Sequence, residues 1–404
     1  MPKKILDCFR TSQEMEYMLS LVLGTPAAQP DESFSWDRFL GFVHKNRLET
    51  LCAAGAAKLP GKPEPLQTLI RESGAFQQKT LQQIRLLAFL AAQLTRAGIR
   101  FLSIKGPLLA AELYGDPSLR HSNDLDLLVS ESDYKSAREV LLSAGLTEYT
   151  GRNQKHYEKE QQHQHEIGED QHEVFMIGNL IVELHWRISF RYPVSFEELW
   201  ENREQRMLLG QPVNCLGKLD NLIYLICHAA GHGFSRLRWL TDLYTLFLRG
   251  GFQYTELYEQ MRIKKAEAFL LETLLLLYRL PSIPMPSISN EFFTIRREEN
   301  RVYFTFHGSL HTPALRACHL TDLLVPLVLT DQNPQGLAER RYMHMLPVVG
   351  RNVTVFTYLY KLIQPKQAEL ERFHFPDSLY FLYYIVRPFY KLWRCTPFYK
   401  GKHK

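Results

Sequence analysis

Residues 99–129 read IRFLSIKGPLLAAELYGDPSLRHSNDLDLLV and determine how this part of the chain folds. The run ends in an apolar strand pattern that nevertheless carries two aspartates, Asp124 and Asp126, separated by one leucine. Side chains two residues apart in a strand point to the same face, so we expect the two carboxylates to project together. Adjacent like charges repel each other unless a cation lies between them, and a divalent metal ion is such a cation.

The sequence around this run alternates between strand and helix patterns. The apolar run IRFLSIKG is followed by the helical PLLAAELYG, and LDLLVS is followed by SDYKSAREVLLSAG, an amphipathic helix that ends at a glycine. A further strand pattern, NLIVELHWRIS at 179–189, places Glu183 and His185 on one face and Val182, Leu184 and Trp186 on the other. This order of elements predicts a small mixed α/β core.

Helical patterns flank the core on both sides, so the predicted fold class is α+β. Residues 281–300, PSIPMPSISNEFFTIRREEN, have the composition of a linker or surface loop. We expect four regions: an N-terminal helical region (1–98), the α/β core (99–190), a helical domain packed on the site (191–280) and a mostly helical C-terminal region (281–404).

The composition is that of an ordinary globular protein. Of the 404 residues, 45% are hydrophobic and 23% are charged, and the net charge of +5 is too small to indicate nucleic acid binding. The six cysteines include no CxxC pair, which is typical of reduced thiols rather than a disulfide framework. No signal peptide and no apolar run long enough to span a bilayer are present, so we expect a cytoplasmic protein.

Three further features join the aspartate pair. Glu183 is a third acid on a later strand, and Lys105-Gly106 follows a strand and opens a helix, where backbone amides can approach a phosphate. Arg120 lies four residues before Asp124 and suits a phosphate oxygen. An isolated Asp-x-Asp is most often a pair of solvated loop carboxylates, but the combination indicates metal-assisted phosphoryl chemistry.

The motifs KGPLLAAELYG (105–115), LRHSNDLDLLV (119–129), VELHW (182–186) and ICHAAGHGFSRLRWLTDL (226–243) resemble a little-characterised nucleotidyltransferase family of the polymerase-β-like superfamily. That family is often encoded beside surface-polysaccharide and peptide natural-product genes. The resemblance covers residues 30–260 and implies a small mixed sheet that binds Mg²⁺, with Mn²⁺ as an alternative, and a nucleoside triphosphate.

The resemblance also implies roles for individual residues. Asp124 and Asp126 match the metal-binding pair, and Glu183 matches the third carboxylate, which binds the metal or accepts the proton of the attacking hydroxyl. Lys105 and Gly106 match the turn that approaches the triphosphate. Pro107 departs from the superfamily pattern, because a serine or a second glycine usually follows the first glycine of this turn. Proline removes one amide and the hydroxyl, and Lys105 and Arg120 would compensate.

Two histidines of the next helical segment, His228 and His232, lie four residues apart and therefore share a helix face. Together with Arg238 and Asp242, they are candidates for base, ribose or acceptor recognition. The alternative is that these residues make only polar contacts between packed helices. A zinc site at His228 and His232 lacks an obvious further ligand.

Other histidines lie at 156, 163, 165, 172 and 185 in a segment rich in Gln and Glu. Their irregular spacing favours a solvated hairpin over a metal site. His185 is the exception, because it follows Glu183 by two residues on the same predicted face and could contact a phosphate or orient a carboxylate.

The sequence therefore predicts a Mg²⁺-dependent nucleotidyltransferase that acts on a small molecule, a glycan or a peptide natural product, and not on nucleic acid. The alternatives are a non-catalytic nucleotide-binding partner of a biosynthetic complex and a toxin-like transferase that modifies tRNA or protein. The C-terminal RPFYKLWRCTPFYKGKHK has six Lys/Arg and no acid. It predicts a packed last helix with a solvated basic end, or contact with the inner face of a membrane.

Overall fold

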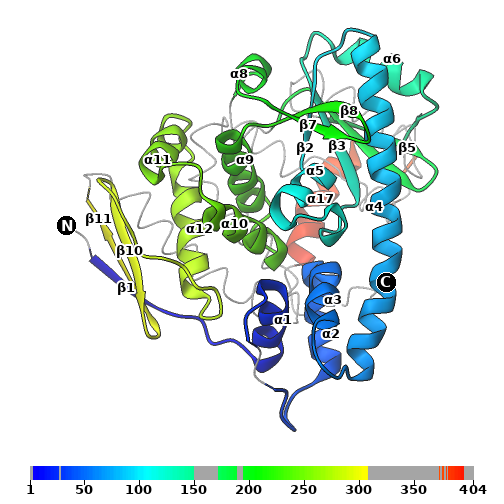
Figure 1. The fold of residues 1–404 in the computed structure, drawn as a ribbon. Coiled ribbons are helices and arrows are strands. Elements are labelled where there is room, and N and C mark those ends of the chain that lie inside the picture. The colour runs from blue at the N-terminus through cyan, green and yellow to red at the C-terminus, as the bar shows by residue number, and fades with distance from the viewer. Residues whose placement is uncertain are drawn as a thin grey trace.

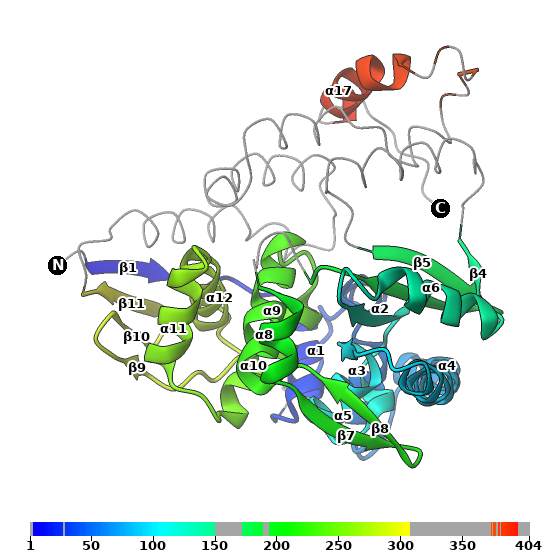
Figure 2. The ribbon, with the colours of Figure 1, turned by 90° about the horizontal axis from the view of Figure 1, so that it is seen from above.

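The computed structural model describes residues 3–26, 29–149, 172–188 and 194–307, together with residues 373, 375, 376, 379 and 381–394. The fold is α+β, as predicted. Two β-sheets lie apart, and a group of helices separates them (Figures 1 and 2). The larger sheet carries the acidic residues, and the smaller sheet lies at the other end of the molecule.

The N-terminal part consists of one strand and four helices, the last of which runs along one side of the molecule (Figure 1). Their bounds are β1 Lys3–Asp7, α1 Gln13–Leu23, α2 Trp36–Asn46, α3 Glu49–Ala57 and α4 Glu64–Arg96.

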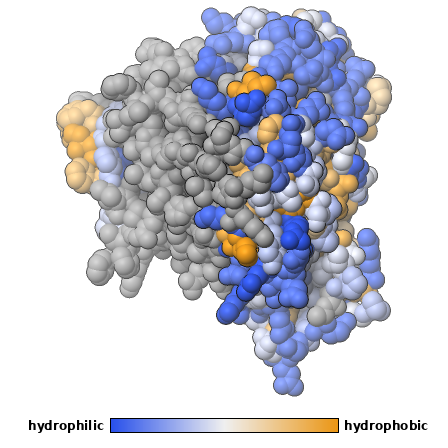
Figure 3. All heavy atoms as spheres, turned by 90° about the vertical axis from the view of Figure 1, so that its left-hand side faces the viewer, coloured by the Kyte–Doolittle hydropathy of each residue, from blue (hydrophilic) through white to orange (hydrophobic). Residues whose placement is uncertain are grey.

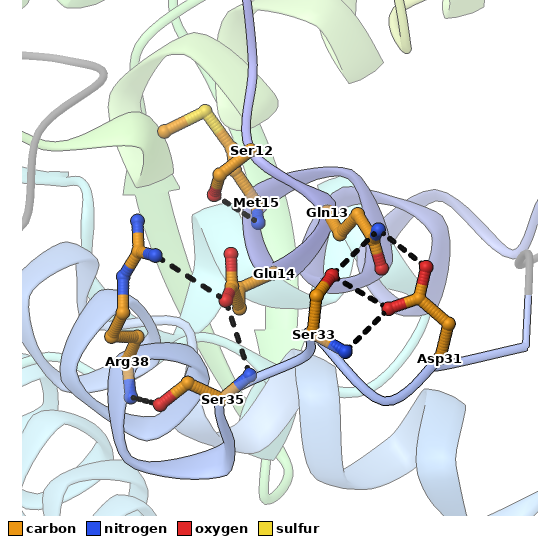
Figure 4. Close-up of polar contacts among 8 residues, drawn as sticks. All are labelled: Ser12, Gln13, Glu14, Met15, Asp31, Ser33, Ser35 and Arg38. Atoms are coloured by element: carbon orange, nitrogen blue, oxygen red, sulfur yellow. Dashed lines mark hydrogen bonds and ion pairs between the residues drawn. The ribbon is translucent and has the colours of Figure 1, made fainter.

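Polar side chains define where the first two helices begin (Figure 4). Ser12 and Ser35 precede α1 and α2, and their hydroxyls accept hydrogen bonds from backbone amides in the first turn of each helix. The buried carboxylate of Glu14 accepts a hydrogen bond from the Ser35 amide at 3.2 Å, which joins the two helix starts. This network fixes the N-terminal helices against each other.

The larger sheet has the strand order β4-β5-β6-β3-β2-β8-β7. The pairs β3·β6 and β2·β8 are parallel, and the other neighbours are antiparallel. The strands are β2 Phe101–Ile104, β3 Asp124–Val129, β4 Thr147–Glu148, β5 His172–Ile177, β6 Leu180–His185, β7 Glu204–Leu208 and β8 Gln211–Cys215.

Short helices connect these strands, and one face of the sheet packs against α4 and α6. The apolar side chains between them, among them Leu90, Leu127 and Val182, form a buried cluster. This burial fixes the register of β3 and β6, because a slip by one residue would bury their carboxylates in that cluster. The connecting elements are α5 Gly106–Tyr114, the 3₁₀ turn η1 Pro117–Leu119, α6 Tyr134–Ser143 and α8 Phe196–Glu201.

Four helices follow, and a second buried cluster joins them to the N-terminal helices and to the smaller sheet. It includes Phe39 of α2, Leu240 in the middle of this group and Phe304 of the smaller sheet. The helices are α9 Lys218–Gly231, α10 Leu237–Arg249, α11 Tyr254–Ile263 and α12 Glu267–Arg279. The smaller sheet has the order β1-β11-β10-β9, with β9 Ile288–Ser289, β10 Phe293–Glu298 and β11 Arg301–Phe306, and the last described helix is α17 Leu382–Arg394.

The linker prediction for 281–300 is wrong, because β9 and β10 lie in this segment. Phe293 and Ile295 are buried on one face of β10, so the alternation of a half-buried strand was present between Pro-rich and charged residues. The purely helical reading of 1–98 also missed β1, which pairs with β11. The domain boundaries themselves stay predictions.

None of the described helices is long and apolar enough to cross a membrane. On the face shown in Figure 3, the coloured atoms are mainly hydrophilic, with separate hydrophobic patches between them.

Candidate active site

Neighbouring strands of the larger sheet bring the predicted carboxylates together. Strands β3 and β6 are parallel neighbours, and Asp126 lies directly opposite Glu183 in their register. Asp124 precedes Asp126 by two residues, so it lies on the same face. The leucines Leu125 and Leu127 point the other way into the buried apolar cluster. The strand predicted at LDLLVS (125–130) is thus confirmed as β3 Asp124–Val129, and it explains why two carboxylates interrupt an apolar run.

Lys105 lies at the end of β2, next to the aspartate pair. Its Nζ lies 3.0 Å from Oδ1 of Asp126, and both side chains are largely buried. The backbone of Lys105 has φ 66° and ψ −145°, a conformation that is rare for any residue except glycine, and Gly106 follows with φ 64°. A strained residue persists only where its surroundings hold it, and such residues gather at functional sites.

His185 lies between two of the carboxylates. Its Nε2 is 3.2 Å from Oδ1 of Asp126 and 3.3 Å from Oε2 of Glu183. The side chain is 9% exposed, so both contacts are shielded from water. His185 thus shares a face with Glu183, as the strand pattern predicted, and it holds the two acids side by side.

The neighbouring charges shift the pKa values of the acids in different directions. Burial alone would raise the pKa of Asp126, but Lys105 and His185 outweigh it and hold that pKa below its usual range. Burial would also raise the pKa of Glu183, but the hydrogen bond with His185 and the charges of His172 and His185 together outweigh it and lower that pKa. For Asp124, burial and the charge of Asp126 raise the pKa, and the more distant Lys105 only partly opposes them. Among the three acids, Asp124 is therefore the one whose negative charge is least compensated by neighbouring cations.

These residues fit a divalent metal ion. Oδ2 of Asp126 is buried and has no hydrogen-bond partner among the described residues, although buried carboxylate oxygens are normally paired. Carboxylate oxygens from two adjacent strands are the ligands that Mg²⁺ and Mn²⁺ take in proteins. Asp124, Asp126 and Glu183 would hold the ion.

Comparison with known proteins identifies the family of this chain. A family model described as "Uncharacterised nucleotidyltransferase" matches residues 32–280, which is more than half of the sequence. The chain belongs to this family. No curated protein and no solved structure matches it significantly. Family membership indicates nucleotidyl transfer as the general activity, with a nucleoside triphosphate as substrate.

Helix α9 packs beside Lys105. The Lys105 Nζ lies 5.7 Å from the ring centroid of Tyr224, and burial raises the pKa of Tyr224 to about 12 although Lys105 opposes this. His228, one turn later, has a pKa well below its usual value because it is buried and close to Lys105. Its ring lies 4.6 Å from that of His232, which in turn stacks on Trp239 at 5.2 Å.

Arg120 and Asp242 form an ion pair with each other. The Arg120 Nε lies 2.9 Å from Oδ2 of Asp242, and both side chains are at most 3% exposed. Tyr114 donates a hydrogen bond to the other carboxylate oxygen at 2.7 Å. The guanidinium of Arg120, which we expected to bind a phosphate oxygen, is therefore paired with Asp242 in this structure. Phosphate binding by Arg120 stays a prediction.

Arg238 is buried on α10 and donates a hydrogen bond to the backbone oxygen of His121. Burial and the nearby Arg120 lower its pKa to about 9, and its Nε has no partner among the described residues. Arg238 is thus close enough to influence Asp124, while His232 is exposed. Recognition of the nucleotide by the α9 and α10 residues stays a prediction.

His172, which the sequence placed among the histidines of a solvated hairpin, lies at the edge of the site. This residue starts β5 and lies directly opposite His185, with the two ring centroids 4.8 Å apart. The signal was the two-residue turn Gly178-Asn179, because such a turn fixes the register of a hairpin and thereby pairs position 172 with position 185. The histidines at 156, 163 and 165 lie outside the described residues.

Proposed function

We propose that the protein is a Mg²⁺-dependent nucleotidyltransferase that transfers a nucleoside monophosphate from a nucleoside triphosphate to an acceptor hydroxyl or phosphate, with release of pyrophosphate. The observation that carries the proposal is the meeting of three carboxylates on β3 and β6 with the Lys105-Gly106 turn. Mn²⁺ is the alternative ion, since its ligand preferences overlap with those of Mg²⁺.

The reaction joins the acceptor oxygen to the α-phosphorus and breaks the bond from this phosphorus to the oxygen that leaves with pyrophosphate. When bound, the metal ions neutralise charge on the attacking and leaving oxygens of such a displacement. Glu183 either joins the aspartate pair as a ligand of the metal ion or accepts the proton of the acceptor hydroxyl, since its pKa is lowered and its side chain is 24% exposed.

The Lys105-Gly106 turn would receive the triphosphate. The first amides of a helix lack intrahelical partners and attract anions, and α5 begins at Gly106. Pro107 supplies no amide, so the positive charge of Lys105 carries a larger share of the phosphate contacts. Lys105 would exchange part of its contact with Asp126 for a phosphate oxygen.

The acceptor that we propose is a small molecule, a glycan or a peptide natural product. This proposal comes from the family resemblance. The mild net charge of +5 argues against a toxin-like enzyme that grips tRNA. A non-catalytic nucleotide-binding partner would have no use for three acids that repel each other, although Pro107 is compatible with it.

Pyrophosphate release tests the proposal without a known acceptor, because water replaces the acceptor slowly. Each of the four nucleoside triphosphates is incubated with protein and Mg²⁺ or Mn²⁺, and pyrophosphate is measured with a pyrophosphatase-coupled assay. We expect metal-dependent release from at least one nucleotide, together with the monophosphate, and none with Asp126→Asn. Equal release by wild type and variant with every nucleotide would contradict the proposal and favour the non-catalytic alternative.

We also propose peripheral contact with the inner face of a membrane through α17, as expected for a cytoplasmic enzyme of surface-glycan assembly. Four large apolar side chains at four-residue spacing are exposed, one just before this helix and three on it: Phe381, Ile385, Phe389 and Trp393, at 56%, 51%, 68% and 43%. The sequence from 387 to 404 adds six Lys/Arg and no acid, which complements anionic lipid.

Co-sedimentation with vesicles of phosphatidylglycerol and phosphatidylcholine tests this contact. The wild-type protein should sediment at low salt, and Ile385→Glu/Phe389→Glu should remain in the supernatant. Met207→Glu, which changes an exposed apolar residue on β7, is the matched control and should sediment normally. Equal sedimentation of all three proteins, or none at all, would refute membrane contact.

A further inference from the structure

The hairpin β5–β6 brings the imidazole of His172 to the edge of the acidic site. His172 and His185 lie directly opposite each other on adjacent antiparallel strands, so their side chains share a face. Glu183 lies on the same face, two residues before His185. Among the residues that the structure describes, this is the one set of three in which a ligand atom from every member lies within 4.8 Å of the other two.

The separations suit ligands of one metal ion. Bonds of about 2.0–2.2 Å from zinc to nitrogen or oxygen place two tetrahedral ligands about 3.4 Å apart. Oε2 of Glu183 lies 3.3 Å from Nε2 of His185 and 3.8 Å from Nε2 of His172. The longer of these separations exceeds a hydrogen bond, so His172 lies at ligand distance without being hydrogen-bonded to Glu183.

We propose that His172, Glu183 and His185 bind a transition-metal ion such as Co²⁺, Zn²⁺ or Mn²⁺ at a position next to the aspartate pair. This proposal deepens the proposed function, since Glu183 would be shared with the ion that Asp124 and Asp126 hold. Imidazole ligands favour transition metals, whereas Mg²⁺ prefers oxygen ligands alone.

The surroundings provide charge and access for such an ion. Oδ1 of Asp126 lies 3.2 Å from Nε2 of His185, so a second carboxylate lies beside the ligand set and lowers the energy of a bound cation. The exposed fraction of the side chain increases from 9% for His185 through 24% for Glu183 to 41% for His172. An ion could therefore enter from the His172 side.

Binding of Co²⁺ tests the proposal, because its visible absorption reports nitrogen ligands independently of activity. Untagged, chelator-treated protein is titrated with Co²⁺ alone and, separately, with Mg²⁺ by calorimetry. We expect His172→Ala to weaken Co²⁺ binding by about tenfold or more and to reduce the visible absorption, with Mg²⁺ affinity within about twofold of wild type. His172 is 41% exposed, so its loss leaves the core intact.

His44→Ala is the matched control. His44 is 49% exposed, and its Nδ1 lies 3.4 Å from Oε1 of Glu49. His121 lies 3.7 Å from the other oxygen of Glu49, but these three residues do not bring one ligand atom each within 4.8 Å of one another. Its Co²⁺ affinity should equal that of wild type. Identical Co²⁺ affinity and spectra in His172→Ala and wild type would overturn the proposal.

The outcomes separate this proposal from the proposed function. Normal Co²⁺ binding by His172→Ala together with metal-dependent pyrophosphate release by wild type refutes the histidine site and leaves nucleotidyl transfer standing. Co²⁺ binding that depends on His172 without pyrophosphate release from any nucleotide supports a metal site and contradicts the transferase mechanism.

Discussion

Two groups of buried acids in this molecule have opposite environments. On α10, Asp242 is 1% exposed and both of its oxygens are paired, one with Arg120 and one with Tyr114. On β3, Asp126 is 2% exposed, yet one oxygen has no partner among the described residues, and Asp124 lies beside it with a raised pKa.

The difference in pairing distinguishes a buried acid that stabilises the fold from acids that are arranged to bind a cation. A buried charge normally requires full pairing, so Asp242 has the environment of a structural residue. Lys105 and His185 hold the pKa of Asp126 below its usual range, and His185 lowers that of Glu183, whereas the charge of Asp124 is only partly compensated. Sites that pre-organise charge for a ligand often lower stability in its absence, and this contrast predicts opposite effects of substitution in the two regions.

The largest expected effect is on activity. Asp124→Asn should lower the rate of pyrophosphate release by about 10³-fold or more, because one metal ligand is lost. Its thermal midpoint in metal-free buffer should equal or exceed that of wild type, since burial and Asp126 raise the pKa of Asp124 and its ionised form is unfavourable in the folded state. Calorimetry and the coupled assay measure both quantities. A large loss of stability would contradict this division between the two regions.

The opposite substitution is Asp242→Ala, which leaves the charge of Arg120 buried and unpaired. It should lower the free energy of unfolding by about 3–5 kcal/mol, as measured by urea denaturation. Glu259→Ala is the control, because its pair with Arg262 is exposed and contributes no more than about 0.5 kcal/mol. The double variant Arg120→Met/Asp242→Leu should lose less stability than Asp242→Ala alone, and a larger loss would argue against charge burial as the cause.

A buried acid outside both groups, Glu49, makes the stability of the fold depend on pH. Burial would raise the pKa of Glu49, but the nearby His121 and His44 outweigh it and lower the pKa from 4.5 to about 2. The unfolded chain therefore binds this proton first as the pH falls, so the stabilisation is present above pH 4.5 and is lost between about pH 4.5 and 2. As the pH falls from 4.5 to 2, the free energy of unfolding should decrease less in Glu49→Gln than in wild type, by on the order of 2 kcal/mol. Parallel urea-unfolding profiles across this range would refute it.

The smallest effect concerns the turn at the start of α5. Gly106 and Gly115 lie at the two ends of this helix with φ of 64° and 77°, so alanine at either position should cost about 1 kcal/mol. Neither added methyl group meets a close contact, the nearest being 3.7 Å from Leu125 at position 106. Only Gly106→Ala should also weaken nucleotide binding, measured by calorimetry with Mg²⁺. Equal nucleotide affinity in the two variants would exclude this turn from the site.

Local patterns predicted which residues of β3 and β6 face the site. The alternation in LDLLV and LIVELH placed Asp126, Glu183 and His185 on defined faces, and burial of the leucines enforces that register. The same kind of reasoning, applied to the Gly178-Asn179 turn, would have found His172. The hairpin β7–β8 was missed because its turn, Leu209-Gly210, places a leucine at a positive φ of 49°.

Contacts between distant segments could not be predicted from spacing. Arg120 and Asp242 are separated by 122 positions, and the sequence offered no reason to pair them rather than to reserve the arginine for phosphate. The backbone conformation of Lys105 is equally non-local, because it depends on Asp126 and on the ring of Tyr224. The smaller sheet was missed because β1 and β11 meet only when the chain folds back on itself across nearly 300 residues.

The most direct test of the central claim is a thermal-shift titration of wild type and Asp124→Asn/Asp126→Asn with ATP, GTP, CTP and UTP, with and without Mg²⁺. A ligand that binds only the folded state raises the midpoint by mass action. The account predicts a Mg²⁺-dependent rise with at least one nucleotide in wild type and none in the double variant. No rise with any nucleotide, or an equal rise in both proteins, would contradict the assignment of these acids to a metal–nucleotide site.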